Sequence, residues 1–169
     1  MKVLIIGYGN PSRRDDGVGW YVVNRLNCAW GLPHVGLLGE PVGLETANFG
    51  PHQVRTLWLQ QLDMGLAEDA AAADRVLFVD AHVDEAPTVV ARVDGATAFG
   101  LTSHVLSPEA VLTLAERCYG SRPEGWRLSV RGEQWDFAAG LSPAVQGRCE
   151  DLADLIAARL FDPAGLADA

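Results

Sequence analysis

Three side chains in this sequence have types and positions that could build a metal site. Asp16 lies in a glycine-containing loop after the first apolar run, Asp80 ends a later apolar run, and His104 precedes a predicted helix. Together they make a carboxylate, carboxylate and imidazole set with open coordination positions. Such a set suits a divalent first-row ion and leaves room for a ligand from a substrate. We therefore treat Asp16, Asp80 and His104 as candidate metal ligands.

Each member of this set also has an ordinary structural interpretation. Asp16 precedes a helix, where a carboxylate often caps backbone amides. Asp80 ends a buried run, so its charge must be paired, coordinated or solvated at the sheet edge. His104 alone is typical of a hydrogen-bonded surface histidine. His82 would point to the same side as Asp80 in an extended segment and could supply a second imidazole, although an exposed loop histidine is the simpler interpretation.

The glycine loop after the first apolar run raises the question of a dinucleotide site. The sequence G-Y-G-N over residues 7–10 resembles the start of such a motif, but Ser12 stands where the third glycine would be. Asp15 and Asp16 would also lie close to the position of a pyrophosphate at the helix N-terminus. These like charges argue against NAD or FAD, and we expect no organic cofactor.

The elements that must position these residues alternate between strand and helix. Buried or alternating apolar runs predict strands, and periodic apolar residues with Ser-Pro starts predict helices. The predicted strands cover residues 3–6, 54–59, 76–79, 88–93 and 126–130, and the predicted helices cover residues 18–26, 64–73, 107–119 and 142–160. Pro87 suits an edge strand. We predict a single α/β domain with a doubly wound, mostly parallel sheet of about five strands and helices on both faces.

One long segment lacks a clear pattern of helix or strand. Residues 28–52 are rich in Gly and Pro, which predicts a long loop with little regular structure. Loops of this length are often functional. Because the segment contains Trp30, Phe49 and Pro51, we interpret residues 28–53 as an insertion that contacts a partner.

Composition and charge exclude several classes of protein. The formal net charge of -9 disfavours nucleic acid, whose binding depends on Lys and Arg. The apolar run at residues 3–6 is too short for a signal peptide or a membrane span. Three separated cysteines without a C-x-x-C pair suit a reducing compartment. We expect a cytoplasmic monomer with no nucleic-acid partner and no membrane span.

Three motifs resemble those of the hydrogenase maturation proteases. Residues 7–19 read G-Y-G-N-P-S-R-R-D-D-G-V-G, similar to the family's opening G-x-G-N followed after five residues by an acidic residue and glycine. Residues 76–81 resemble its apolar strand ending in Asp-Ala, and residues 102–108 resemble its histidine segment. The motifs occur in the family's order and cover most of the chain.

This resemblance implies an activity and a partner. It implies an endopeptidase that removes the C-terminal extension from the nickel-loaded precursor of a nickel-iron hydrogenase large subunit, with the nickel supplied by that precursor. Asp16, Asp80 and His104 match the family's metal-contacting and catalytic trio. Many members have Glu at the position of Asp16, and some have an aspartate after the second strand, where Asp63 is only a weak substitute.

The hydrolytic step and two other functions stay open at this point. We find no G-x-S-x-G, no H-E-x-x-H and no Ser-His-Asp order, so we favour a metal-polarised carbonyl or water with a carboxylate as proton acceptor. G-Y-G-N-P over residues 7–11 also resembles peptidyl-tRNA hydrolases, but that family's early histidine is missing, since His34 is the first one here. A noncatalytic nickel or precursor-binding chaperone is the third possibility.

Overall fold

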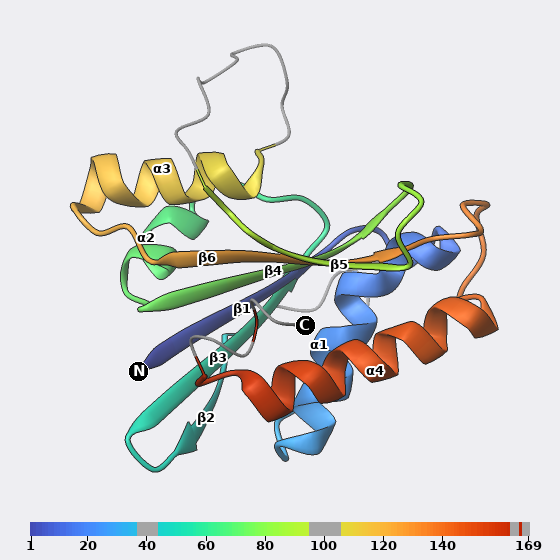
Figure 1. Ribbon diagram of the computed structural model, residues 1–169, viewed down its shortest axis with the longest axis horizontal. Coiled ribbons are helices and arrows are strands. Elements are labelled where there is room, and N and C mark those ends of the chain that lie inside the picture. Colours follow the sequence, from blue (N-terminus) through green and yellow to red (C-terminus); the bar gives the residue numbers. More distant parts are fainter. Residues whose placement is uncertain (37–43, 95–105, 163–165, 167–169) are drawn as a thin grey trace.

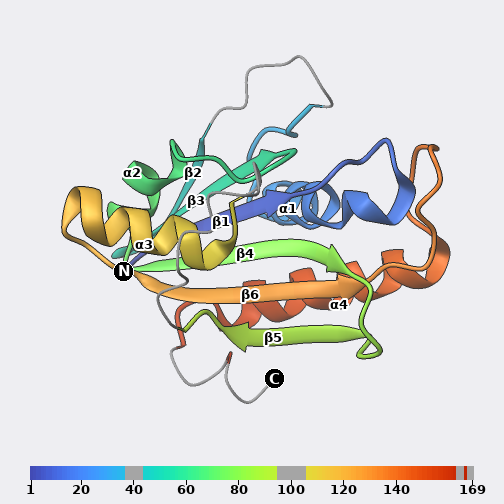
Figure 2. The same cartoon turned by 90° about the horizontal axis from the view of Figure 1, so that it is seen from above.

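The chain folds into one sheet with helices on both faces. A computed structural model describes residues 1–36, 44–94, 106–162 and 166. Within these residues six strands form a sheet in the order β2-β3-β1-β4-β6-β5, which Figure 2 shows from above. The predicted α/β fold with a doubly wound, mostly parallel sheet is confirmed. The sheet has six strands where we expected about five.

Four parallel strands make up the centre of the sheet. β1 (Lys2–Tyr8) lies between β3 (His52–Leu59) and β4 (Arg75–His82), and β6 (Glu124–Arg131) lies beside β4. Each contains one of the predicted runs. Central parallel strands are covered on both faces, which explains the continuous apolar runs of β1 and β4.

Two antiparallel strands form the edges of the sheet. β5 (Thr88–Arg92) pairs with β6 at one edge, as Pro87 had indicated. β2 (Glu45–Phe49) pairs with β3 at the other edge. Our prediction of a long irregular loop over residues 28–52 is therefore wrong in its second half, where the chain forms a hairpin that turns at Gly50 with a φ of 58°.

The helices divide between the two faces of the sheet. α1 (Val18–Ala29) and α4 (Pro143–Arg159) cover one face, and α2 (Leu66–Ala71) and α3 (Pro108–Tyr119) cover the other (Figure 1). Alternate residues of β1 enter the two cores: Ile5 packs on the side of α1 and α4, and Ile6 packs on the side of α2 and α3. Within the described residues, no helix has the length and apolar character needed to cross a membrane.

The two predicted Ser-Pro helix starts are used differently. The Oγ of Ser107 accepts a hydrogen bond from the backbone N of Ala110 at 3.3 Å, so Ser107 caps α3 as predicted. α4 also begins after a serine, but Ser142 makes no capping bond with its side chain. Its hydroxyl instead donates to Oδ2 of Asp15 at 2.9 Å. The hydroxyl of Ser142 therefore contacts the loop after β1 and does not cap α4.

The winding of the sheet reverses at β1. The chain leaves β1 through α1 and enters β3 on one side of it, then passes through α2 to β4 on its other side. In open α/β sheets such a reversal leaves a crevice at the carboxyl ends of the strands. The carboxyl ends of β1 and β4 therefore mark where a ligand is expected.

The start of α1 lies unusually close to the end of β1 because glycines face each other there. A Cβ added to Gly19 would lie 2.3 Å from both the backbone N and O of Tyr8, and 2.7 Å from the carbonyl oxygen of Val79. A Cβ on Gly7 would lie 2.3 Å from the carbonyl oxygen of Gly19. Only glycine permits these backbone contacts.

We expect Gly19→Ala to destabilise the protein, because its methyl group would meet backbone atoms that cannot move independently. The free energy of unfolding should fall by about 1–3 kcal/mol or more. Gly147→Ala is the matched control, since Gly147 is exposed in α4 and a Cβ there meets nothing within 4 Å. It should stabilise by about 0.5–1 kcal/mol through helix propensity. Urea unfolding followed by circular dichroism measures both, and equal effects would contradict the close approach.

Candidate active site

Asp16 lies in a short 3-10 helix, Arg14–Gly17, between β1 and α1. The N-cap position of α1 is occupied by Gly17, so the interpretation of Asp16 as the capping residue of that helix is wrong. Its Oδ2 lies 3.8 Å from Nη1 of Arg13, and its side chain is 23% exposed. Asp16 is thus a partly accessible carboxylate, and Arg13 is its ion-pair partner within the described part of the chain.

Asp80 lies near the carboxyl end of β4, on the sheet face covered by α2 and α3. Its register partner on β6 is Ser129, and the preceding residue, Val79, pairs with Gly7 of β1. The backbone N of Ala81 donates to Oδ1 of Asp80 at 2.7 Å. Asp80 therefore stands beside the carboxyl end of β1, where the winding reverses.

Gly9 brings the two predicted carboxylates to the same place. A Cβ on Gly9 would lie 2.2 Å from the carbonyl oxygen of Asp16 and 3.3 Å from Oδ1 of Asp80. Gly9 has a φ of 117°, which other residues rarely adopt. The backbone at Gly9 is therefore in contact with both segments, and the structure brings Asp16 and Asp80 together as the sequence predicted.

The surroundings of Asp80 raise its pKa from 3.8 to about 7. Burial is the main cause, and the negative charge of Asp16 acts in the same direction. The hydrogen bond from Ala81 and the hydroxyl of Tyr8 act in the opposite direction. Burial and the charge of Asp80 also raise the pKa of Tyr8. Sequence analysis did not identify Tyr8 as part of the site.

A small cavity of about 150 Å³ opens beside Asp80 and is lined by both polar and apolar groups. His82 lines it on the same side as Asp80, as its position on the strand predicted. Its Nε2 lies 2.8 Å from the carbonyl oxygen of Ala86, while its Nδ1 is buried and has no hydrogen-bond partner among the described residues. The remaining lining residues are Tyr8, Ala81, Asp84, Val89, Arg127 and Ser129.

The chemistry of the two carboxylates suits a divalent cation, since a positive ion between Asp16 and Asp80 would offset their repulsion. In the part of the chain that the structure describes, no three His, Cys, Asp or Glu side chains form a group that could hold a metal ion. The third predicted ligand, His104, lies outside the described residues. The metal-binding set of Asp16, Asp80 and His104 therefore stays a prediction.

Two further aspartates differ from what the sequence suggested. Asp63, the weak substitute for a family aspartate, is exposed and its Oδ1 accepts a bond from the backbone N of Gly65 at 2.7 Å. Asp15 was not identified as important, yet it is fully buried. Burial alone would raise the pKa of Asp15, but hydrogen bonds from Ser142, Glu133 and Gln134 outweigh burial and lower it. The only local signal was its place beside Asp16.

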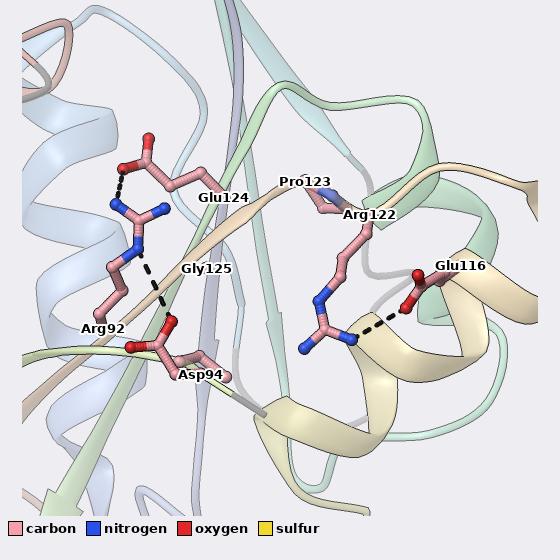
Figure 3. A pocket seen from close by; sticks show the side chains of 8 residues that line it. Arg92, Asp94, Glu116, Arg122, Pro123, Glu124 and Gly125 are labelled. Carbon is pink, nitrogen blue, oxygen red and sulfur yellow. Dashed lines mark hydrogen bonds and ion pairs between the residues drawn. The ribbon is translucent and has the colours of Figure 1, made fainter. Parts of the chain in front are cut away.

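A larger cavity of about 600 Å³ lies at the opposite end of the parallel strands and contains none of the candidate residues (Figure 3). Its charged groups are paired: Arg92 contacts Asp94 and Glu124, and Arg122 contacts Glu116. Ligands of open α/β sheets bind at the carboxyl ends of the strands instead. We therefore place the candidate site at Asp16 and Asp80.

Solved hydrogenase maturation proteases share this fold. The NiFe hydrogenase maturation protease HycI from Thermococcus kodakarensis is 23% identical, with 94% of this chain and 92% of that one covered and a TM-score of 0.64. The hydrogenase maturating endopeptidase HybD from Escherichia coli is 24% identical, with 96% and 94% covered and a TM-score of 0.63. A peptidyl-tRNA hydrolase is 18% identical, with 94% and 86% covered and a TM-score of 0.50.

No protein-family model and no curated protein sequence matches the chain. The solved structures nevertheless define its class: this is an α/β protein with the fold of the hydrogenase maturation proteases.

We expect Asp80→Asn to stabilise the protein increasingly as the pH rises from 5 to 8. Because the folded-state pKa of Asp80 is raised to about 7, the wild type loses stability as pH rises between 3.8 and that value. An amide keeps the bond from Ala81 without the charge, so the gain at pH 8 should be roughly 1–3 kcal/mol. Thermal melts at several pH values measure this.

The control for this experiment is Asp84→Asn, which removes an exposed carboxylate at the same cavity. Its melting temperature should follow that of the wild type at every pH. A gain for Asp80→Asn that is the same at pH 5 and pH 8 would contradict the raised pKa.

Proposed function

We propose that this protein is an endopeptidase that removes the C-terminal extension from the nickel-loaded precursor of a nickel-iron hydrogenase large subunit. The observation that carries the proposal is the meeting of Asp16 and Asp80 at the reversal point of a sheet with the hydrogenase maturation protease fold. The three sequence motifs add to it, because they occur in the family's order. We propose a cytoplasmic location, since the three cysteines have no paired motif.

In the proposed reaction the nickel ion belongs to the substrate. Asp16, Asp80 and His104 contact it while the precursor supplies its other ligands. The ion supplies Lewis acidity that polarises the scissile carbonyl or lowers the pKa of a water molecule. Asp16 is one carbon shorter than the glutamate of many family members, so its oxygen lies farther back by about one carbon-carbon bond.

The residues of this chain have two tasks in that reaction. The carboxylates orient the metal-bearing end of the precursor, and one of them accepts the proton of the attacking water and returns it to the leaving amine. Asp80 is recessed, and its carboxylate already accepts a bond from the backbone N of Ala81 and interacts with the hydroxyl of Tyr8. The lone pairs that remain make these contacts. This assignment requires no nucleophilic serine or cysteine.

Two other functions, a peptidyl-tRNA hydrolase and a noncatalytic chaperone, can be distinguished from the proposed peptidase. The fold likeness to a peptidyl-tRNA hydrolase favours that enzyme, but the chain has no histidine before His34 and a net charge of -9, which suits tRNA poorly. A nickel or precursor chaperone would use the same carboxylates without hydrolysis. Only a change in the mass of the precursor distinguishes the chaperone from the peptidase.

We expect the purified protein to shorten a nickel-loaded large-subunit precursor and to leave the nickel-free precursor intact. Intact-mass spectrometry measures both products. Asp16→Ala and His104→Ala should each slow cleavage by at least about 100-fold, the range of positioned acid-base groups. A stable complex with unchanged precursor mass would instead support the chaperone.

Matched controls separate loss of the site from loss of fold. Asp151→Ala and Asp154→Ala each remove an exposed carboxylate on α4. Both variants should cleave at the wild-type rate. If Asp16→Ala cleaves as fast as these controls, the assignment of Asp16 is wrong.

A further inference from the structure

We propose that Asp15 is a positioning residue that holds Asp16 at the cleavage site by fastening the 3-10 helix, Arg14–Gly17, to residues 133–142. This inference rests on the proposed function for its kinetic consequence. Its structural part stands on contacts described here, and none of these contacts involves the substrate.

The carboxylate of Asp15 is fully buried and accepts four hydrogen bonds from one distant segment. Oδ1 accepts a bond from the backbone N of Ser142 at 2.7 Å. Oδ2 accepts bonds from the backbone N of Glu133 at 2.9 Å, from the backbone N of Gln134 at 2.8 Å and from the Ser142 hydroxyl at 2.9 Å. One side chain thus binds both ends of residues 133–142.

Backbone bonds extend the same contact along the helix that carries Asp16. The backbone N of Asp15 donates to the carbonyl oxygen of Gln134 at 3.1 Å, and that of Arg14 donates to Ala138 at 3.0 Å. Arg13 and Ala138 form a parallel bridge. Residues 13–15 are therefore bound through their backbone to residues 134–138, much as one short strand is bound to its neighbour.

Two residues depart from their local structural preferences in order to make the contact between the 3-10 helix and residues 133–142. Ser142 begins α4 but gives its hydroxyl to Asp15 instead of capping the helix. Arg14 adopts a φ of 45°, the only positive φ of a non-glycine residue among those described. Such departures from local preference cluster at functional sites, where the surrounding structure maintains them.

The position of Asp16 depends on this network because its own side chain is weakly held. Its contact with Arg13 is 3.8 Å long, and its backbone N donates to the carbonyl oxygen of Arg13 at 3.1 Å within the same turn. These local contacts leave Asp16 free to move with the whole turn. Without the carboxylate of Asp15, the turn would keep only its backbone bonds and the exposed Arg14–Asp136 ion pair to residues 133–142. Asp16 would then be held less firmly beside Asp80.

The test is Asp15→Asn, which keeps the shape of the side chain but replaces one acceptor oxygen with a donor. In either orientation of the amide, its NH₂ group faces at least one backbone N–H group. We expect kcat for the nickel-loaded precursor to fall by about 100-fold, the cost of a misplaced catalytic group, with KM little changed. The assay is run at a temperature where circular dichroism and thermal melting show a fully folded variant.

A second variant and a matched control keep the test sharp. Ser142→Ala removes the hydroxyl bond but leaves the three backbone bonds, so kcat should fall by less than for Asp15→Asn. Asp136→Asn removes the negative charge from the exposed 3.0 Å ion pair between Arg14 and Asp136, which joins the same two segments, and should leave kcat unchanged.

Amide hydrogen exchange gives a readout that does not depend on activity. We expect residues 14–16 to lose protection in Asp15→Asn, and to keep it in Asp136→Asn. If Asp15→Asn does not fold, the same comparison is made with Ser142→Ala. Failure of the wild type to cleave the precursor would reject the proposed function, while the exchange result would still decide whether Asp15 holds the turn.

The proposal is overturned by any of three results. One is a folded Asp15→Asn variant with the wild-type kcat. Another is unchanged exchange at residues 14–16 in both Asp15→Asn and Ser142→Ala. The third is a loss of kcat that follows the unfolded fraction and returns fully at lower temperature, because a purely structural role would produce it.

Discussion

The candidate site depends on a close approach between backbones at the carboxyl end of β1. Gly7 and Gly19 let the start of α1 touch the strand, and Gly9 lets the turn that carries Asp16 touch the segment of Asp80. A side chain at any of these positions would separate the layers by the width of a methyl group or more. The glycines are therefore required for packing first, and they create the site because the packing brings two carboxylates together.

This packing has an electrostatic cost that the rest of the fold must offset. Asp80 loses solvent and lies near the charge of Asp16, and both effects raise its pKa to about 7. An uncharged residue in that position would suit the stability of the sheet better. Carboxylates that cost stability are typical of sites where activity and stability conflict. The two cores around β1 and β4, which contain apolar side chains on both faces, provide the stability that tolerates this cost.

The sequence predicted those features that depend on local patterns. The apolar runs of β1, β3 and β4 and the Ser107 start of α3 are complete within a few residues, so periodicity and capping rules identify them. Asp80 could be found because a charge at the end of a buried run is itself an anomaly. Its meeting with Asp16 followed from the rule that parallel strands share a carboxyl edge.

Features that depend on distant partners were missed. β2 is an edge strand in which only Ala47 is buried, so no alternation of apolar residues announces it. Ser142 has the sequence of a helix cap, but its hydroxyl is taken by a residue 127 positions away. Asp16 was a plausible N-cap because it precedes a helix, but the N-cap residue of α1 is Gly17. Local rules fail at these residues because tertiary contacts offer stronger alternatives.

The neighbouring aspartates at positions 15 and 16 show what separates a structural carboxylate from a chemical one. The four hydrogen bonds of Asp15 use both of its oxygens, and its burial leaves no path to a ligand. Among the described residues, Asp16 has an ion pair with Arg13 at 3.8 Å, and its side chain is partly accessible. The two residues are of the same type and adjacent in the sequence. The difference in their hydrogen bonding therefore arises from the donor groups of residues 133–142, which reach Asp15. A carboxylate with free lone pairs can bind a cation, whereas a satisfied one would first have to abandon its hydrogen bonds. The second aspartate of the pair is therefore the one whose carboxylate can bind a cation without giving up such bonds.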